Sequence, residues 1–192
     1  DDGQRTMQVS PNRIIEVSDS GNDVFKRIDS GNGYFSSDYA AGNTGTGLIA
    51  PGSVTDPAAW AASTNKKVAI NFTVTAGVTT YDLVDTVTGN SLLTGGPGPA
   101  PVANQRTFQS GQPIVLEFQA GEAFFDLGAS TTISGTPANG DSFSIAPSTS
   151  QSIFATVANL IGALETPTGS AAADTKYMND IGFAITNLDQ GI

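Results

Sequence analysis

The fold is decided by one stretch of sequence, Val68-Ala69-Ile70-Asn71-Phe72-Thr73-Val74. Large apolar side chains at every second position alternate with small or polar ones, which is the period of a strand with one buried face. Ala76-Gly77 follows, and glycine tolerates the positive φ that a tight turn needs. A second strand continues through Tyr81 to Leu83, so this stretch predicts a β-hairpin.

The same alternation returns further along the chain. Short strands are predicted at 114–118, 124–127, 131–133 and 142–145. Turn-forming residues separate them, and strands of this length and spacing favour a small β-sandwich or barrel-like domain. The Gly- and Pro-rich stretch Gly95–Pro101 interrupts the pattern and predicts an exposed loop, because proline lacks an N–H and glycine loses more entropy on ordering.

The apolar period becomes helical after Pro147, with a break at Thr166–Gly169 between two predicted amphipathic helices. The predicted packing residues are Ile153, Phe154, Val157, Leu160, Ile161 and Leu164 in the first helix, and Tyr177, Met178, Ile181, Ile185 and Leu188 in the second. Two short helices make a poor bundle alone, so we expect these residues to pack within a larger inner domain. The second helix runs almost to the last residue without a C-cap, which suggests a cut within the helix. Asn159 and Asn187 are the predicted outward positions.

Two smaller elements lie nearer the start of the chain. Residues 6–9 and 13–17 flank Ser10-Pro11-Asn12 and predict a hairpin. Asp56-Pro57 predicts the start of a short helix, with Asp as the N-cap and Pro at the first helical position. We expect Trp60 to anchor this helix in the core rather than to form an interface.

Together these elements predict an α+β, mainly β fold. Its outer domain is a small sandwich or barrel-like β unit, and its partial inner domain consists of a β-hairpin and two amphipathic helices. The predicted boundaries are 1–45 for the extended part of the inner domain, 46–146 for the outer β domain and 147–192 for the helical part.

The charge of the chain excludes several partners. There are 18 acidic and 8 basic residues, a net charge of −10, and the largest basic clusters are the pairs Lys26-Arg27 and Lys66-Lys67. Nucleic acids and anionic membranes require clustered Lys and Arg, so we expect neither as a partner. No apolar run approaches the roughly 18 residues of a membrane span.

The chain contains no Cys and no His, which removes disulfides, thiolate ligands and the commonest general base. The carboxylates of Glu117, Glu122 and Asp126 lie close in sequence, as a glycosidase would need, but we expect them to be solvated surface charges. Asp19-Ser20-Gly21-Asn22-Asp23 weakly resembles a calcium loop and lacks its final glutamate, so we expect a hairpin turn there. The sequence therefore predicts no enzyme, no cofactor and no metal site.

The order of several short motifs is more specific than any one of them. The motifs are Gly31–Phe35, Asn43–Ile49, Gly52–Trp60, Ile133–Pro137, Gly140–Ile145 and Ser152–Phe154. In this order they resemble the third bacterial flagellar hook-associated protein, the flagellin-related junction protein on the filament side of the hook. The resemblance runs from about Ile14 to Leu188, although the Gly95–Val102 loop does not match the family.

The resemblance implies a middle fragment that lacks the terminal coiled-coil helices. It implies a structural role in motility, as an adaptor that links the hook to the filament. The implied partners are the hook-side junction protein, flagellin and copies of the same chain in a ring, with an export chaperone for the full-length protein. The implied location is the extracellular flagellum, reached through the type III export route. We expect the isolated fragment to be a monomer, because the assembly helices are missing.

Other readings of the sequence stay open at this stage. Within the same class, the chain could be a fragment of the hook-side junction protein or of a flagellin-like subunit. From a different class, it could be an extracellular glycan-binding or adhesin β module. That module should expose aromatic side chains around a groove, and four Tyr and one Trp are few for this purpose.

Overall fold

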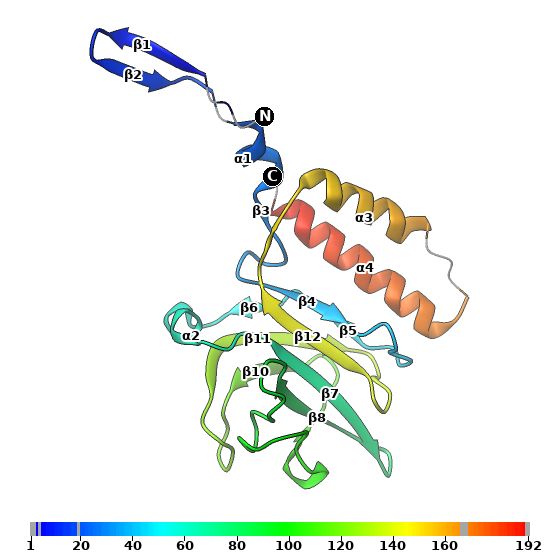
Figure 1. Ribbon diagram of the computed structural model, residues 1–192. Coiled ribbons are helices and arrows are strands. Elements are labelled where there is room, and N and C mark those ends of the chain that lie inside the picture. Colours follow the sequence, from blue (N-terminus) through cyan, green and yellow to red (C-terminus); the bar gives the residue numbers. More distant parts are fainter. Residues whose placement is uncertain (1–2, 4, 19, 166–168, 191–192) are drawn as a thin grey trace.

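The computed structural model describes residues 3, 5–18, 20–165 and 169–190. The molecule has three parts: a β layer built of two sheets, a layer of two helices beside it, and a hairpin that projects away from both (Figure 1). The two described long helices and the sheets confirm the predicted α+β, mainly β class, and the two sheets do not close into a barrel.

The larger sheet has five antiparallel strands in the order β4 (Phe35–Tyr39), β12 (Ser142–Pro147), β7 (Val68–Thr75), β8 (Val78–Asp85) and β9 (Arg106–Thr107). The predicted central hairpin is confirmed, since β7 and β8 pair from Val68↔Asp85 to Thr75↔Val78. Its turn residues Ala76 and Gly77 have φ of 51° and 79°. Both values are positive, as a two-residue type I′ turn requires.

The smaller sheet is built around β11 (Asp126–Ser134), which pairs with β10 (Pro113–Glu117), β5 (Leu48–Ile49) and β6 (Ser53–Val54). We predicted two strands at 124–127 and 131–133, and this was wrong: one nine-residue strand spans both. Gly128 has a φ of +58° within β11, and its carbonyl accepts from the N–H groups of Thr55 and Asp56. The strand therefore bends through a glycine instead of ending there.

The core fills the space between the two sheets. Phe72 lies at its centre and meets Phe108 and Phe143 edge to face at 5.0 and 5.8 Å. The predicted short helix is α2 (Pro57–Ala62), and Asp56 caps it by accepting from the N–H groups of Ala58 and Ala59. Trp60 is buried, 5.4 Å from the ring of Phe35, which confirms its role as an anchor.

The Gly- and Pro-rich loop is more firmly held than an exposed loop would be. Asp82 on β8 is fully buried, and its carboxylate accepts from the Ser91 hydroxyl at 2.7 Å and from the Ala100 N–H at 2.6 Å. A short 3₁₀ turn, Val102–Asn104, follows. The loop is thus tied at both ends to one buried carboxylate.

The helical layer consists of α3 (Ile153–Glu165) and α4 (Ala171–Asp189), which run in opposite directions side by side (Figure 1). Ser170 caps α4, since its hydroxyl accepts from the Ala173 N–H. A two-stranded ladder of β3 (Ile28–Asp29) and β13 (Ser150–Gln151) joins this layer to the rest.

The N-terminal hairpin pairs β1 (Thr6–Ser10) with β2 (Arg13–Glu16), as predicted, and projects from the body (Figure 1). The turn predicted at Asp19–Asp23 was wrong where the structure describes it, because helix α1 (Gly21–Lys26) begins there. Asp19 itself lies outside the described residues.

The predicted boundary at residue 45 crosses a sheet. β4 belongs to the segment 1–45, yet it pairs with β12 along five residue positions. This pairing favours a boundary near residue 30, and the three-part division itself stays a prediction.

Gly128→Ala should destabilise the chain by about 3 kcal/mol, because alanine disfavours this φ and its Cβ would lie 2.3 Å from the backbone oxygen of Asp56. Gly140→Ala is the matched control, since Gly140 has a φ of +86° and open space around it. It should cost only about 1–2 kcal/mol. Urea unfolding measures the free energy of unfolding of both variants. An equal loss of stability in the two would contradict the predicted clash with the Asp56 oxygen.

Candidate functional site: seams and helix faces

The β layer has two seams, where an edge strand of one sheet faces an edge strand of the other. Among the described residues, no ladder joins β9 to β10 or β4 to β5. Edge strands present unpaired N–H and C=O groups, which must be satisfied or covered. Side chains do this at both seams.

Arg106 closes the seam between β9 and β10. Its Nη1 donates to the Val115 oxygen at 2.7 Å and its Nη2 to the Glu117 oxygen at 2.6 Å. Nε and Nη2 also donate to the two carboxylate oxygens of Glu122, at 2.8 and 2.6 Å. The guanidinium therefore takes the place of the strand-to-strand bonds that are missing here.

The Arg106–Glu122 pair is buried, with side chains 6% and 13% exposed. Our expectation that Glu122 is a solvated surface charge was therefore wrong. Burial lowers the pKa of Arg106, but the hydrogen bond to Glu122 and the interactions with Tyr81 and the Glu122 charge together hold this pKa above its ordinary value. Burial raises the pKa of Glu122, while the bonds from Arg106 and from the Gln119 N–H bring it below its ordinary value. The pair is charged at neutral pH and serves structure.

Asn179 of α4 closes the seam between β4 and β5. Its Oδ1 accepts from the Ile49 N–H at 3.0 Å, and its Nδ2 donates to the Gly47 oxygen at 3.2 Å. Asn179 is buried. One side-chain amide thus pairs with the free edge of β5 as a neighbouring strand would.

Four further residues of α4 contact the loop and strand on the β4 side. Lys176 Nζ donates to the Ala41 oxygen at 2.5 Å, and the Asp180 carboxylate accepts from the Tyr39 hydroxyl at 2.9 Å. Phe183 stacks on the Tyr39 ring at 6.2 Å. The Asn187 Oδ1 accepts from the Gly31 N–H at 2.7 Å. Together with Asn179 they form the α4 docking face, defined as Lys176, Asn179, Asp180, Phe183 and Asn187.

The docking face corrects one prediction and shows what the sequence reasoning missed. Asn187 points toward the β layer, so its predicted outward position was wrong; Asn159 on α3 is exposed. The five residues recur at spacings of three or four, on one side of the helix. This polar stripe was the available signal, but the search for apolar periodicity passed over it.

Burial raises the pKa of the Tyr39 hydroxyl, and its hydrogen bond to the Asp180 carboxylate raises it further. The phenol therefore stays protonated, and a hydrogen-bond donor, at neutral pH.

More than half of the predicted packing residues on α3 and α4 face away from the β layer and are exposed. Six of them are well exposed: Phe154 66%, Val157 41%, Ile161 51%, Leu164 56%, Met178 53% and Ile185 57%. The expectation that these residues pack within a larger inner domain stays a prediction. Thr156 and Ala163 of α3 and Asn179 and Ala184 of α4 are the buried residues of the two helices. The α3 apolar face, defined as Phe154, Val157, Ile161 and Leu164, is largely exposed, and the Phe25 ring of α1 lies 6.0 Å from that of Phe154.

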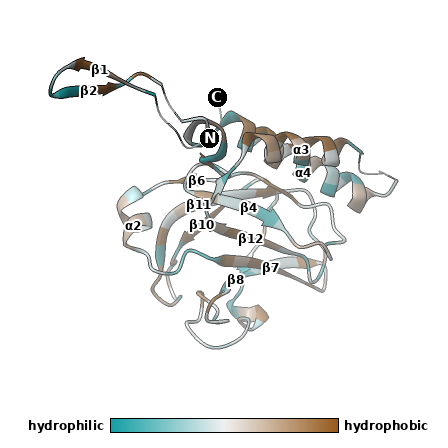
Figure 2. Ribbon diagram, turned by 45° about the horizontal axis from the view of Figure 1, so that its top comes forward, coloured by the Kyte–Doolittle hydropathy of each residue, from teal (hydrophilic) through white to brown (hydrophobic). Residues whose placement is uncertain are grey.

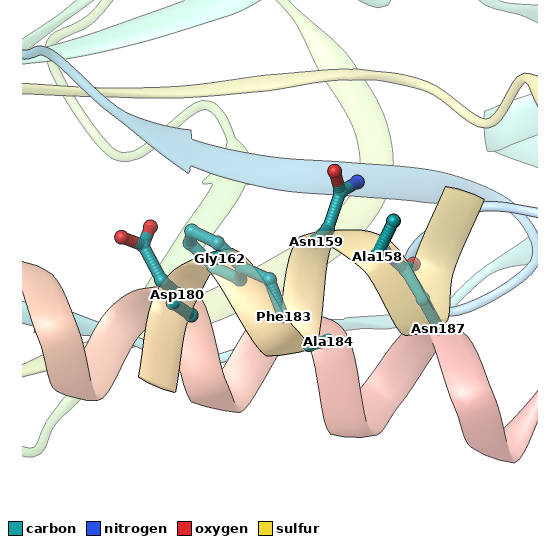
Figure 3. Close-up of a pocket in the computed structure, with 8 residues that line it drawn as sticks. Ala158, Asn159, Gly162, Asp180, Phe183, Ala184 and Asn187 are labelled. Atoms are coloured by element: carbon teal, nitrogen blue, oxygen red, sulfur yellow. The ribbon is translucent and has the colours of Figure 1, made fainter. Parts of the chain in front are cut away.

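Small side chains leave space between the two helices. A cavity of about 380 Å³ lies there, lined by Ala158, Asn159, Gly162, Ala163, Asp180, Phe183, Ala184 and Asn187 (Figure 3). The lining has no cluster of chemically active groups.

The hairpin is likewise uncovered. Its apolar side chains Met7, Val9, Ile14, Ile15 and Val17 are all exposed. In Figure 2, much of β1 and of α3 has the brown colour of hydrophobic residues, and both lie on the same side of the β layer. An isolated two-stranded hairpin is marginally stable in water, so these faces need cover from elsewhere.

The described residues offer little for catalysis or metal binding. No group of three or more Asp and Glu side chains comes together among them to hold a metal ion. Glu117 is exposed, and Glu122 is occupied by Arg106. In the part of the chain that the structure describes, no helix is long and apolar enough to cross a membrane.

Comparison with known proteins identifies the arrangement. No family model matches the sequence, and no curated protein sequence matches it. Among solved structures, the flagellar junction protein FlgL from Legionella pneumophila matches all of this chain at 28% identity and a TM-score of 0.79.

This chain resembles FlgL along its whole length. A second Legionella structure, described as flagellar hook associated protein-3, gives 27% identity and a TM-score of 0.80. FlgL from Xanthomonas campestris, at 24% identity and a TM-score of 0.77, shows the same fold. The resemblance inferred from motif order is thereby confirmed. The chain spans about half of these FlgL chains, 53–54% of their length.

Glu122→Gln should make stability less sensitive to acid. A lowered carboxyl pKa stabilises the fold above the ordinary value of 4.5, and this contribution is lost as pH falls through the folded-state pKa. At pH 7 the variant should lose roughly 3 kcal/mol, and the gap from wild type should shrink between pH 5 and pH 3. Urea unfolding of both proteins over this pH range measures the difference in their free energies of unfolding. Glu117→Gln, at an exposed site, should change little, and a constant Glu122→Gln gap at all pH values would contradict the prediction.

Proposed function

We propose that this chain is part of a structural junction subunit of the bacterial flagellum, which links the hook to the filament. The supporting observation is the match of this whole chain to about half of each of two Legionella structures, described as a flagellar junction protein and a hook-associated protein. The proposed subunit is not an enzyme, in keeping with the occupied carboxylates among the described residues. Its work is mechanical.

The uncovered faces suggest how the chain enters a larger structure. The proposed inner domain contains the hairpin, α3 and α4, and further segments of the longer protein cover the exposed apolar residues of this chain. The eleven predicted packing residues keep their proposed role within this inner domain, and the six exposed ones are the residues that such segments would cover. Burying an aliphatic or aromatic side chain contributes about 1.5–3 kcal/mol, so the four residues of the α3 apolar face are a substantial source of assembly energy.

The proposed partners are the hook-side junction protein, flagellin and further copies of the same subunit in a ring. An export chaperone would bind the full-length protein before type III export, and the assembled protein would be extracellular. That the isolated chain is a monomer stays a prediction, which light scattering at micromolar concentration tests.

Deletion of the parent gene tests the junction role. We expect hooks without filaments by electron microscopy, and flagellin released into the medium. Complementation with the intact gene should restore filaments. Normal filaments and normal swimming after deletion would overturn the proposal.

The double substitution Phe154→Ser and Ile161→Ser tests the proposed role of the α3 apolar face. Because both side chains are exposed, the isolated chain should keep its stability within about 0.5 kcal/mol in urea unfolding. In the full-length protein the same change should prevent complementation of the deletion. Ala155→Ser, at an exposed position outside this face, is the control and should complement. Filaments formed by the double variant would show that the face is dispensable.

A further inference from the structure

Strand β5 offers one edge to its sheet and the other to helix α4. The N–H groups of Thr46 and Ala50 donate to the Thr136 and Thr132 oxygens, on the side of β11. Alternate residues of a strand point their backbone groups to opposite edges, so Gly47 and Ile49 face the seam. There the Asn179 amide meets both of them, at 3.2 and 3.0 Å.

The rest of the α4 docking face holds the other side of the same seam. Lys176 and Asp180 reach Ala41 and Tyr39, around the end of β4, and Asn187 reaches Gly31 before it. Residues 176 to 187 span three turns, about 16 Å of helix. The helix is therefore bonded to both sides of the seam along most of its length.

We propose that α4 acts as a latch across the seam between β4 and β5, so that the helical layer and the β layer move as one rigid body. A hinge between the layers would have to break the Asn179 bonds, the Tyr39–Asp180 bond and the Asn187–Gly31 bond together. Breaking the Asn179 bonds would leave its buried side-chain amide and the backbone groups of Gly47 and Ile49 without partners, which is costly in an environment shielded from water. This inference concerns the chain itself and does not depend on the flagellar role.

The latch also makes the integrity of the β layer depend on the helix. If α4 leaves, the Ile49 N–H and the Gly47 oxygen lose the Asn179 amide. Asn32 and Ser37 still donate to backbone oxygens just after β5, so the seam is weakened most at β5 itself. Local opening should then appear first at Ile49 and not in the long β7–β8 hairpin, whose ladder runs over eight residue pairs.

Distance measurements between the layers test the proposal. The chain has no Cys, so a Val87→Cys and Asn159→Cys variant can carry two spin labels at exposed positions in the β layer and on α3. A single narrow distance distribution is expected. Adding Asn179→Ala should broaden it, and hydrogen exchange of the Ile49 amide should accelerate at least about tenfold, while β7 and β8 keep their protection.

The control is Asn139→Ala, which removes one side-chain bond to the Val74 N–H far from the seam and should leave the distribution narrow. If Asn179→Ala does not fold, Tyr39→Phe combined with Asn187→Ala weakens the latch while keeping the buried amide, and the same broadening is expected. A broad or two-peaked distribution in the unmodified pair would overturn the proposal. So would an unchanged distribution and unchanged Ile49 exchange in the latch variants.

Discussion

A sheet must satisfy the backbone groups along its edges, and the structure depends on how this chain does so. Its two sheets do not join into a barrel, so two seams remain between them. At one, Arg106 uses four hydrogen bonds to join two strands and a turn. At the other, Asn179 pairs with β5 from a helix more than 100 residues later in the chain. The β layer and the helical layer are consequently parts of one folding unit.

This solution inverts the usual orientation of an amphipathic helix. α4 turns a largely polar face to the β layer and leaves Met178 and Ile185 exposed. Hydrogen bonds fix the helix in register, because each must meet one particular partner, whereas apolar contacts would tolerate sliding. The apolar sides of α3, α4 and the hairpin then remain available for burial against something else. The residues that hold α4 on the β layer are therefore different from those that we propose for association.

The sequence predicts well where the physics is local. Alternation at 68–74, the turn at Ala76-Gly77, the Asp56 cap and the two long helices all follow from short-range patterns, and the structure has them. It predicts poorly where pairing is distant. The Arg106–Glu122 pair links residues 16 apart, and the Asn179 bonds span 130 and 132 positions. The two helices were predicted at the right places in the sequence, but nothing local says which side of a helix meets the rest of the chain.

The carboxylate of Asp82 carries a consequence for how this protein can change over evolutionary time. It holds the loop of residues 91–100 through a serine hydroxyl and a main-chain N–H at Ala100. Any residue except proline supplies such an N–H, so this hydrogen bond does not depend on which side chain stands at position 100. Leu93 packs in the core, but the exposed residues of the loop can change, lengthen or acquire new surface chemistry while the strand beneath stays unchanged. Variation confined to the exposed part of this loop is the outcome that such an anchor permits.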